Sequence, residues 1–214
     1  MSATVRLLLA AIVAAVPAVA AAQRPQIQLV LPERASLATE APWVRSAALV
    51  SDGALRDLMH NGFPARLHYR VERWATGGWF DDIKATAEWD VVMRYDALAR
   101  VYQVFRAHRN RTQYLGGFTT FADAEAALDA PFRVPVSVPG RGQRSYYSLV
   151  LEIEMLSLTE LDEVERWLRG ELKPAVRGKK NPGTAVSRGV RAVVVRLLGG
   201  EKRRYETRSG TFRP

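Results

Sequence analysis

The sequence predicts a mostly β protein: an antiparallel β-sandwich with short peripheral helices and a basic amphipathic C-terminal segment. Three observations indicate this fold class. About seven runs of residues alternate apolar and polar side chains, which is typical of strands with one buried and one solvated face. Turn residues join most of these runs as hairpins. Helical spacing is confined to two or three short stretches, so packed antiparallel sheets are favoured, with an open α+β sheet as the alternative.

The N-terminal residues have the features of a signal peptide. Arg6 provides a positive charge, residues 7–16 form an unbroken apolar run, and the small residues at 18–22 suit a signal peptidase. We expect cleavage after Ala22, with Ala20 as the alternative. The apolar run is shorter than the ~20 residues that a membrane-spanning helix needs. No cysteine stands at the cleavage site, which excludes a lipoprotein anchor.

The mature protein is expected to be periplasmic or otherwise extracytoplasmic. The sequence divides the chain into three parts. They are a signal peptide at 1–22, a β-rich domain at 23–170, and a basic linker, amphipathic segment and tail at 171–214. The chain has no cysteine, so in an oxidising compartment its stability depends on packing alone, without disulfides.

The first elements of the domain are short. Residues 26–31 alternate weakly and predict an edge strand, and Trp43–Val50 predicts a second strand. Ser51-Asp52-Gly53 begins a short helix that reaches about Asn61. There, Asn61-Gly62 tolerates the left-handed backbone that ends helices.

The centre of the chain predicts a long β-hairpin. Apolar and polar residues alternate from Phe63 to Glu72 and again from Ile83 to Tyr95, and Gly77-Gly78 between them provides a turn. A turn centred near Gly78 predicts a register in which opposite charges face one another on the solvated side. The predicted pairs are Glu72 with Lys84, His68 with Glu88, Arg66 with Asp90 and, on the buried side, Leu67 with Trp89.

The remaining elements follow in the same way. Residues 101–108 and 111–115 predict a second hairpin, and Thr120 with Asp123 predicts a capped helix of about ten residues. Residues 132–138 alternate as a strand, in which Pro135 favours a sheet edge. Residues 147–155 predict a long strand, and Ser157 or Thr159 begins a helix that ends near Arg169.

Positive charge is concentrated at the C-terminal end. The net charge is +9, yet the residues up to Gly170 hold 19 basic and 19 acidic side chains, and residues 171–214 hold 12 basic and 3 acidic ones. Residues 184–198 have an amphipathic pattern with arginines on the polar side, compatible with a helix or with a strand through 192–198. Lys202 then begins a polar tail. The valine face of the amphipathic segment either docks on the domain, leaving its arginines solvated, or holds those arginines toward an anionic membrane surface or an acidic partner.

No pattern of catalytic, cofactor-binding or metal-binding residues stands out. The three histidines lack metal-ligand spacing, and Asp81-Asp82 reads as turn solvation rather than a calcium site. We therefore predict no catalytic residue, no cofactor and no metal ligand. The candidate binding patch joins two tryptophans expected to be exposed with basic residues of the C-terminal part. It consists of Trp74, Trp79, Arg188, Arg191, Arg196, Lys202, Arg203 and Arg204.

Two short strings give the chain a resemblance to a known family. Gly62-Phe63-Pro64, followed by Arg94-Tyr95-x-x-Leu98-x-x-x-Tyr102-x-Val104 and by the helix at 120–128, resembles the exported bacterial domain-of-unknown-function family 4390 over residues 43–168. The resemblance implies an exported protein with a signal peptide and transfers no catalytic residue.

The leading functional prediction is a non-enzymatic periplasmic binding or accessory module that uses a sheet face or a loop end. Its expected partner is an unidentified protein or envelope component, or an anionic membrane surface. Nucleic acid is disfavoured because an exported protein rarely meets it, although the charge alone would attract it. The alternatives are a periplasmic hydrolase with a dispersed active site and a structural envelope component.

Overall fold

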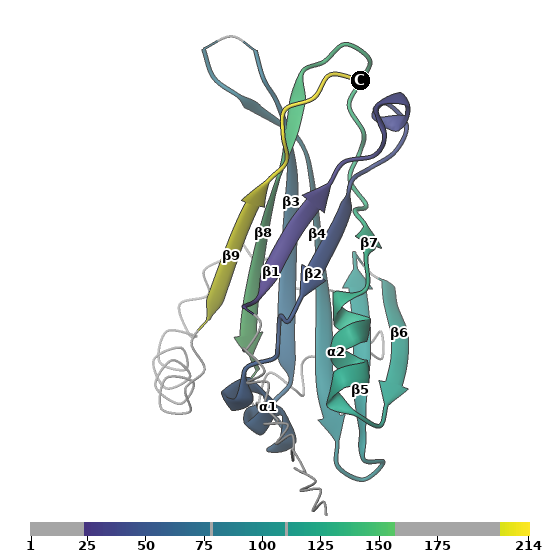
Figure 1. Cartoon of the computed structure of the whole chain (residues 1–214), viewed down its shortest axis with the longest axis vertical. Helices are drawn as coiled ribbons and strands as arrows, with labels where there is room; N and C mark the ends of the chain where they lie inside the picture. The colour runs from purple at the N-terminus through teal and green to yellow at the C-terminus, as the bar shows by residue number, and fades with distance from the viewer. Residues whose placement is uncertain (1–23, 78, 110, 157–201) are drawn as a thin grey trace, which may run out of the picture.

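The larger of two antiparallel sheets has six strands in the order β6-β5-β4-β3-β8-β9 (Figure 1). The computed structural model describes residues 24–77, 79–109, 111–156 and 202–214. Within them the strands of the large sheet are β3 (Ala65–Ala75), β4 (Asp82–Asp96), β5 (Val101–His108), β6 (Arg111–Phe118), β8 (Ser145–Met155) and β9 (Arg203–Arg208).

A smaller sheet and two helices cover one face of the large sheet (Figure 1). The small sheet has the order β1-β2-β7, and helix α2 packs between β2 and the pair β5 and β6. The bounds are β1 (Gln26–Val30), a 3-10 turn (Arg34–Ser36), β2 (Trp43–Ala47), α1 (Gly53–His60), α2 (Phe121–Asp129) and β7 (Phe132–Arg133). This layered, mostly β arrangement with short peripheral helices confirms the predicted fold class.

The core lies between the two sheets and follows from the alternation in the sequence. Leu67 and Val71 of β3 and Leu149 and Leu151 of β8 are fully buried, while their strand neighbours face the opposite side. At the centre, the Trp89 ring stacks on Tyr69 at 4.9 Å between ring centroids and contacts Phe132. The predicted faces of β3 and β8 are therefore confirmed.

The predicted register of the central hairpin is wrong by two residues. His68 lies opposite Asp90, Leu67 opposite Val91, and Tyr69 opposite Trp89. The connection is centred between positions 78 and 79 rather than at 78, and the register shifts again between Arg73 and Trp74, where β4 has one extra residue. A slip of two residues keeps side chains on their predicted faces from Ala87 to Met93, where the burial pattern is as expected. Nearer the turn the extra residue of β4 breaks the pattern, and Ile83, predicted to be buried, is 47% exposed.

Both helices begin where the sequence indicates. The Asp52 carboxylate accepts a hydrogen bond from the Ala54 N–H at 2.8 Å, and the Thr120 hydroxyl accepts one from the Asp123 N–H at 3.1 Å. The Thr120 hydroxyl also donates to the Asp123 carboxylate at 2.6 Å. The strand expected at 132–138 is only β7, which Pro135 stops from continuing because proline has no N–H to donate; the Val134 N–H before it still donates to the Pro42 carbonyl at 3.0 Å.

The C-terminal residues form part of the large sheet, which corrects the expected polar tail. Strand β9 pairs with β8, with Tyr205 opposite Leu151, and Ser145 is bridged to Phe212. Residues 202–214 therefore belong to the β domain. The expected signal peptide with its cleavage after Ala22 or Ala20, the helix from Ser157 or Thr159 and the amphipathic segment at 184–198 lie outside the described residues.

Candidate functional site

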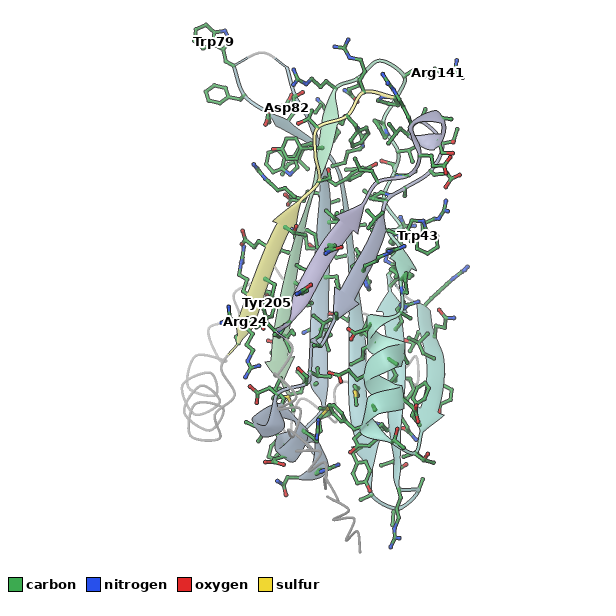
Figure 2. The ribbon with its side chains drawn as sticks, viewed as in Figure 1. Arg24, Trp43, Trp79, Asp82, Arg141 and Tyr205 are labelled. Carbon is green, nitrogen blue, oxygen red and sulfur yellow. The ribbon has the colours of Figure 1, made fainter. Side chains whose placement is uncertain are left out.

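The most exposed aromatic side chains of the described residues lie at the tip of the β3–β4 hairpin. The Trp79 side chain is 97% exposed and that of Phe80 is 85% exposed. Figure 2 shows Trp79 at the end of a loop that projects beyond both sheets. Exposed aromatic rings are costly in water, so an adjacent pair at a protruding tip indicates a contact surface. Trp79 is thus exposed as predicted.

The loop that carries these two rings is braced against the end of the sheet. The Thr76 N–H donates to the Arg144 carbonyl at 2.8 Å on one side. On the other side, the Tyr146 hydroxyl donates to the Asp81 carboxylate at 3.1 Å. Burial, together with the hydrogen bond to Asp81, raises the pKa of Tyr146, so the hydroxyl stays protonated as a donor. We call the loop from Thr76 to Asp81 the hairpin tip.

Trp74 is not an exposed binding residue, contrary to prediction. Its ring is half-buried and stacks parallel to Tyr146, and its Nε1–H donates to the Ser148 hydroxyl at 3.1 Å. Arg208 lies over the other ring of the pair, 4.8 Å from the Tyr146 centroid, and donates to its hydroxyl. Trp74 therefore supports the base of the hairpin tip instead of contacting a partner.

Three arginines at the same end of the sheet as the hairpin tip have no charged partner among the described residues. Arg141 and Arg144 flank the turn before β8, and Arg213 follows Phe212, whose backbone exchanges two hydrogen bonds with Ser145. Among the carboxylates that the structure describes, none forms an ion pair with these guanidinium groups. Sequence reasoning missed them, although the Pro-Gly-Arg-Gly loop at 139–142 signals an exposed arginine.

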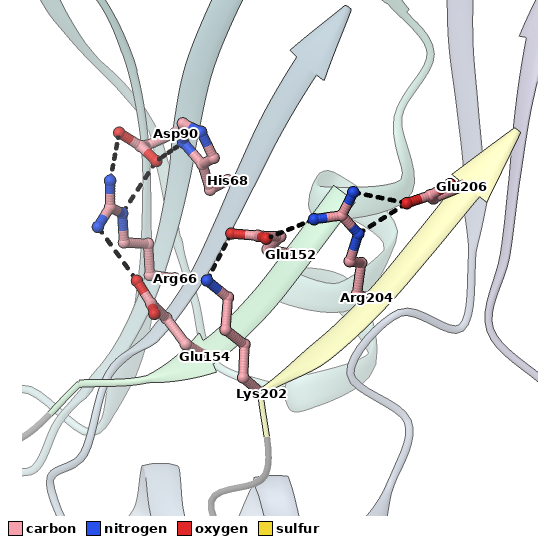
Figure 3. Close-up of polar contacts among 8 residues, drawn as sticks. All are labelled: Arg66, His68, Asp90, Glu152, Glu154, Lys202, Arg204 and Glu206. Atoms are coloured by element: carbon pink, nitrogen blue, oxygen red, sulfur yellow. Dashed lines mark hydrogen bonds and ion pairs between the residues drawn. The ribbon is translucent and has the colours of Figure 1, made fainter. Parts of the chain in front are cut away.

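Of the basic residues predicted for the patch, the three that the structure describes, Lys202, Arg203 and Arg204, already have carboxylate partners. Lys202 pairs with Glu152 at 2.6 Å, and Arg203 pairs with Asp52 at 2.6 Å. Arg204 pairs with both Glu152 and Glu206 (Figure 3). These residues stabilise the pairing of β9, so they are poor candidates for a partner's charges. Arg188, Arg191 and Arg196 lie outside the described residues.

The same outer face of the large sheet has a more buried ion network on β3, β4 and β8. Arg66 donates to both oxygens of Asp90, at 2.9 and 3.1 Å, and to Glu154 at 3.1 Å (Figure 3). His68 contacts Asp90 at 2.8 Å. Burial alone would raise the pKa of Asp90, but His68 and Arg66 together lower it. Both carboxylates of the network have Arg66 as a partner within the sheet, so the arrangement is typical of a structural surface.

A polar cluster around Asp129 is the arrangement in the structure that most resembles the dispersed active site of a hydrolase. The Asp129 carboxylate accepts from the Ala48 N–H at 2.8 Å and is hydrogen-bonded by Ser46, which also contacts Tyr69. Burial raises the pKa of Asp129. The hydrogen-bond partners of His60, His68 and His108 are Tyr102, Asp90 and the Glu88 carbonyl, so the described residues show no Ser–His contact. The cluster therefore joins a buried carboxylate to a serine hydroxyl, and none of the described histidines contacts that serine.

Two further findings bear on the class of protein. No three His, Asp or Glu side chains in the described part of the chain are grouped as a metal site would require, and Asp82 pairs with Lys84. None of the described helices has the length and apolar character needed to cross a bilayer. No family model, curated protein or solved structure matches this chain.

Proposed function

We propose that the protein is a non-enzymatic, extracytoplasmic binding module that engages its partner through the hairpin tip. The observation that carries the proposal is the exposure of Trp79 and Phe80, 97% and 85%, on a loop whose two ends are held by Arg144 and Tyr146. A braced loop loses little conformational freedom on binding, so more of the contact energy appears as affinity. Burial of two large apolar side chains contributes about 1.5–3 kcal/mol each.

The export step belongs to the same proposal. It is supported by the apolar run at 7–16 followed by small residues, and by the resemblance to family 4390. In the residues that carry this resemblance, Tyr95 lies opposite Tyr102 and Leu98 lies in the β4–β5 turn. These positions define a strand corner at the far end of the sheet, so the resemblance itself indicates no active site there.

Site-specific photo-cross-linking tests the proposed function. A photoreactive phenylalanine analogue is placed at Trp79 or, as the matched control, at Leu98, whose side chain is 100% exposed. Strand β4 has 15 residues, so the two positions are separated by roughly 45–50 Å at about 3.3 Å per residue. We expect a defined adduct with envelope material from position 79 only. The absence of an adduct at position 79, or equal adducts at both positions, would contradict the proposal.

A further inference from the structure

We propose that the occupant of the hairpin tip is an anionic lipid surface: Trp79 and Phe80 enter the headgroup region, and Arg141, Arg144 and Arg213 bind lipid phosphates around them. This inference rests on the proposed function, because it assigns a partner to the same loop. The cations proposed to bind lipid are therefore not Lys202, Arg203 and Arg204, which the sequence suggested, but three arginines toward the opposite end of β9.

Backbone hydrogen bonds place the three arginines at the end of the large sheet from which the hairpin tip projects. The carbonyl of Arg144 accepts the Thr76 N–H, at the residue where the tip begins. The Ser145 N–H and carbonyl bond to Phe212 at 2.9 and 2.8 Å, which positions Arg213 over the same turn. The Gly142 N–H donates to the Pro214 carbonyl at 2.9 Å, next to Arg141. Figure 2 shows Arg141 and Trp79 at the same end of the molecule.

The charges at this end are unbalanced, in contrast to those on the outer face of the sheet. Residues 76–84, 139–147 and 208–214 contain five cationic side chains and two carboxylates. Asp81 accepts from Tyr146 and Asp82 pairs with Lys84, so neither carboxylate neutralises Arg141, Arg144 or Arg213. An unpaired guanidinium is a strong donor for a phosphate oxygen.

The small exposed apolar area of the hairpin tip favours a bilayer over a protein groove as its partner. A standard protein interface buries about 800 Å² on each partner, whereas the exposed apolar surface here is concentrated on two adjacent rings. Tryptophan is enriched at membrane–water interfaces because its ring is amphipathic. Each basic residue near an anionic surface raises the partition coefficient about fivefold. Aromatic insertion combined with unpaired cations is therefore the chemistry of an anionic lipid headgroup layer.

Vesicle co-sedimentation of the full chain tests this proposal. The probes are phosphatidylcholine vesicles with and without 30% phosphatidylglycerol, on the order of the anionic content that basic segments detect. The variants are Trp79→Ala with Phe80→Ala, and Arg141→Gln with Arg144→Gln and Arg213→Gln. The matched control, Arg45→Gln with Arg100→Gln and Arg109→Gln, removes the same charge from exposed arginines elsewhere. Identical thermal unfolding of all forms shows that they fold.

The expected result is binding to the anionic vesicles only, reduced at least tenfold in the aromatic variant and about 100-fold in the Arg141, Arg144 and Arg213 variant. The control is expected to change little. The lipid proposal is overturned if wild type ignores anionic vesicles, if the control loses as much as the test variant, or if Arg188→Gln with Arg191→Gln and Arg196→Gln alone abolishes binding. A protein adduct at position 79 without vesicle binding overturns the lipid partner and leaves the proposed function standing. Vesicle binding unaffected by the aromatic variant also overturns the lipid proposal, because the tip then does not contact the vesicle, and the adduct at position 79 decides the proposed function.

Discussion

Replacing Arg66 by methionine tests whether the network on the outer face of the large sheet is structural. The Arg66 side chain is 23% exposed and holds Asp90 and Glu154, which are 17% and 25% exposed. Its loss leaves two partly buried carboxylates without their arginine partner, so we expect the free energy of unfolding at pH 7 to fall by about 2–4 kcal/mol.

Arg70→Met is the matched control, because Arg70 lies four residues along the same strand and face. It also has two carboxylate partners, Glu72 and Glu88, but its side chain is 47% exposed. An ion pair in that environment contributes at most about 1 kcal/mol. The burial of Arg66, not the number of its partners, is therefore predicted to set the difference between the variants.

The pH dependence gives a second readout of the same substitution. In the folded protein the pKa of Asp90 is lowered by His68 and Arg66 against the effect of burial. The folded carboxyl thus binds a proton less readily than the unfolded one. Its contribution is present above the unfolded pKa, near 4, and is lost as the pH falls through the folded pKa. We expect the gap between wild type and Arg66→Met to narrow as the pH falls below about 4.

Urea unfolding followed by circular dichroism at pH 7 and at pH 3 measures both effects. The reasoning is refuted if Arg66→Met and Arg70→Met differ by less than about 0.5 kcal/mol at pH 7, a value within the range of ordinary surface substitutions. It is also refuted if the loss caused by Arg66→Met is the same at both pH values.

Three further predictions concern other polar groups. Asp129→Ala leaves the Ala48 N–H without its acceptor and is expected to cost about 1–3 kcal/mol. Asp129→Asn keeps an oxygen acceptor for that N–H, and burial already raises the pKa of Asp129, so it is expected to change the free energy of unfolding at pH 7 very little. Equal losses of stability for Asp129→Ala and Asp129→Asn in chemical denaturation would contradict this. Burial raises the pKa of Tyr147 to about 12, and its buried hydroxyl has no hydrogen-bond partner in the part of the chain that the structure describes. Tyr147→Phe is therefore expected to raise the melting temperature, and a marked fall would contradict this. Tyr146→Phe removes the hydrogen bond to Asp81. It is expected to lower the free energy of unfolding by about 1 kcal/mol and to speed amide hydrogen exchange at residues 79–82. Unchanged exchange would show that this hydrogen bond does not hold the loop.

The sequence predicted the faces of the strands better than their register. Burial of one side of β3 and β8 follows directly from alternation, which depends only on neighbours along the chain. The register depends on the centre of the β3–β4 connection and on the extra residue near Trp74, and neither has a local signal. Strand β9 was missed because Arg203–Arg208 has one large apolar residue, Tyr205, and becomes a strand through pairing with β8.

The candidate site was predicted only where it depends on neighbouring residues in the chain. Trp79 follows two glycines at a turn, so its exposure is a local property. The covering of Trp74 depends on Tyr146, which is distant in the chain and reaches it only because β3 and β8 are neighbours. The arginines at the base of the hairpin tip come together only when Phe212 bridges to Ser145.

The most direct test of the hairpin tip uses the absence of native cysteines, which allows a single dye at a chosen position. An environment-sensitive fluorophore is attached to Phe80→Cys or, as the control, to Leu98→Cys. On addition of envelope membranes, binding through the tip predicts a blue-shifted emission from position 80 and an unchanged emission from position 98. An unchanged spectrum at position 80, or the same shift at both positions, would contradict binding through the tip.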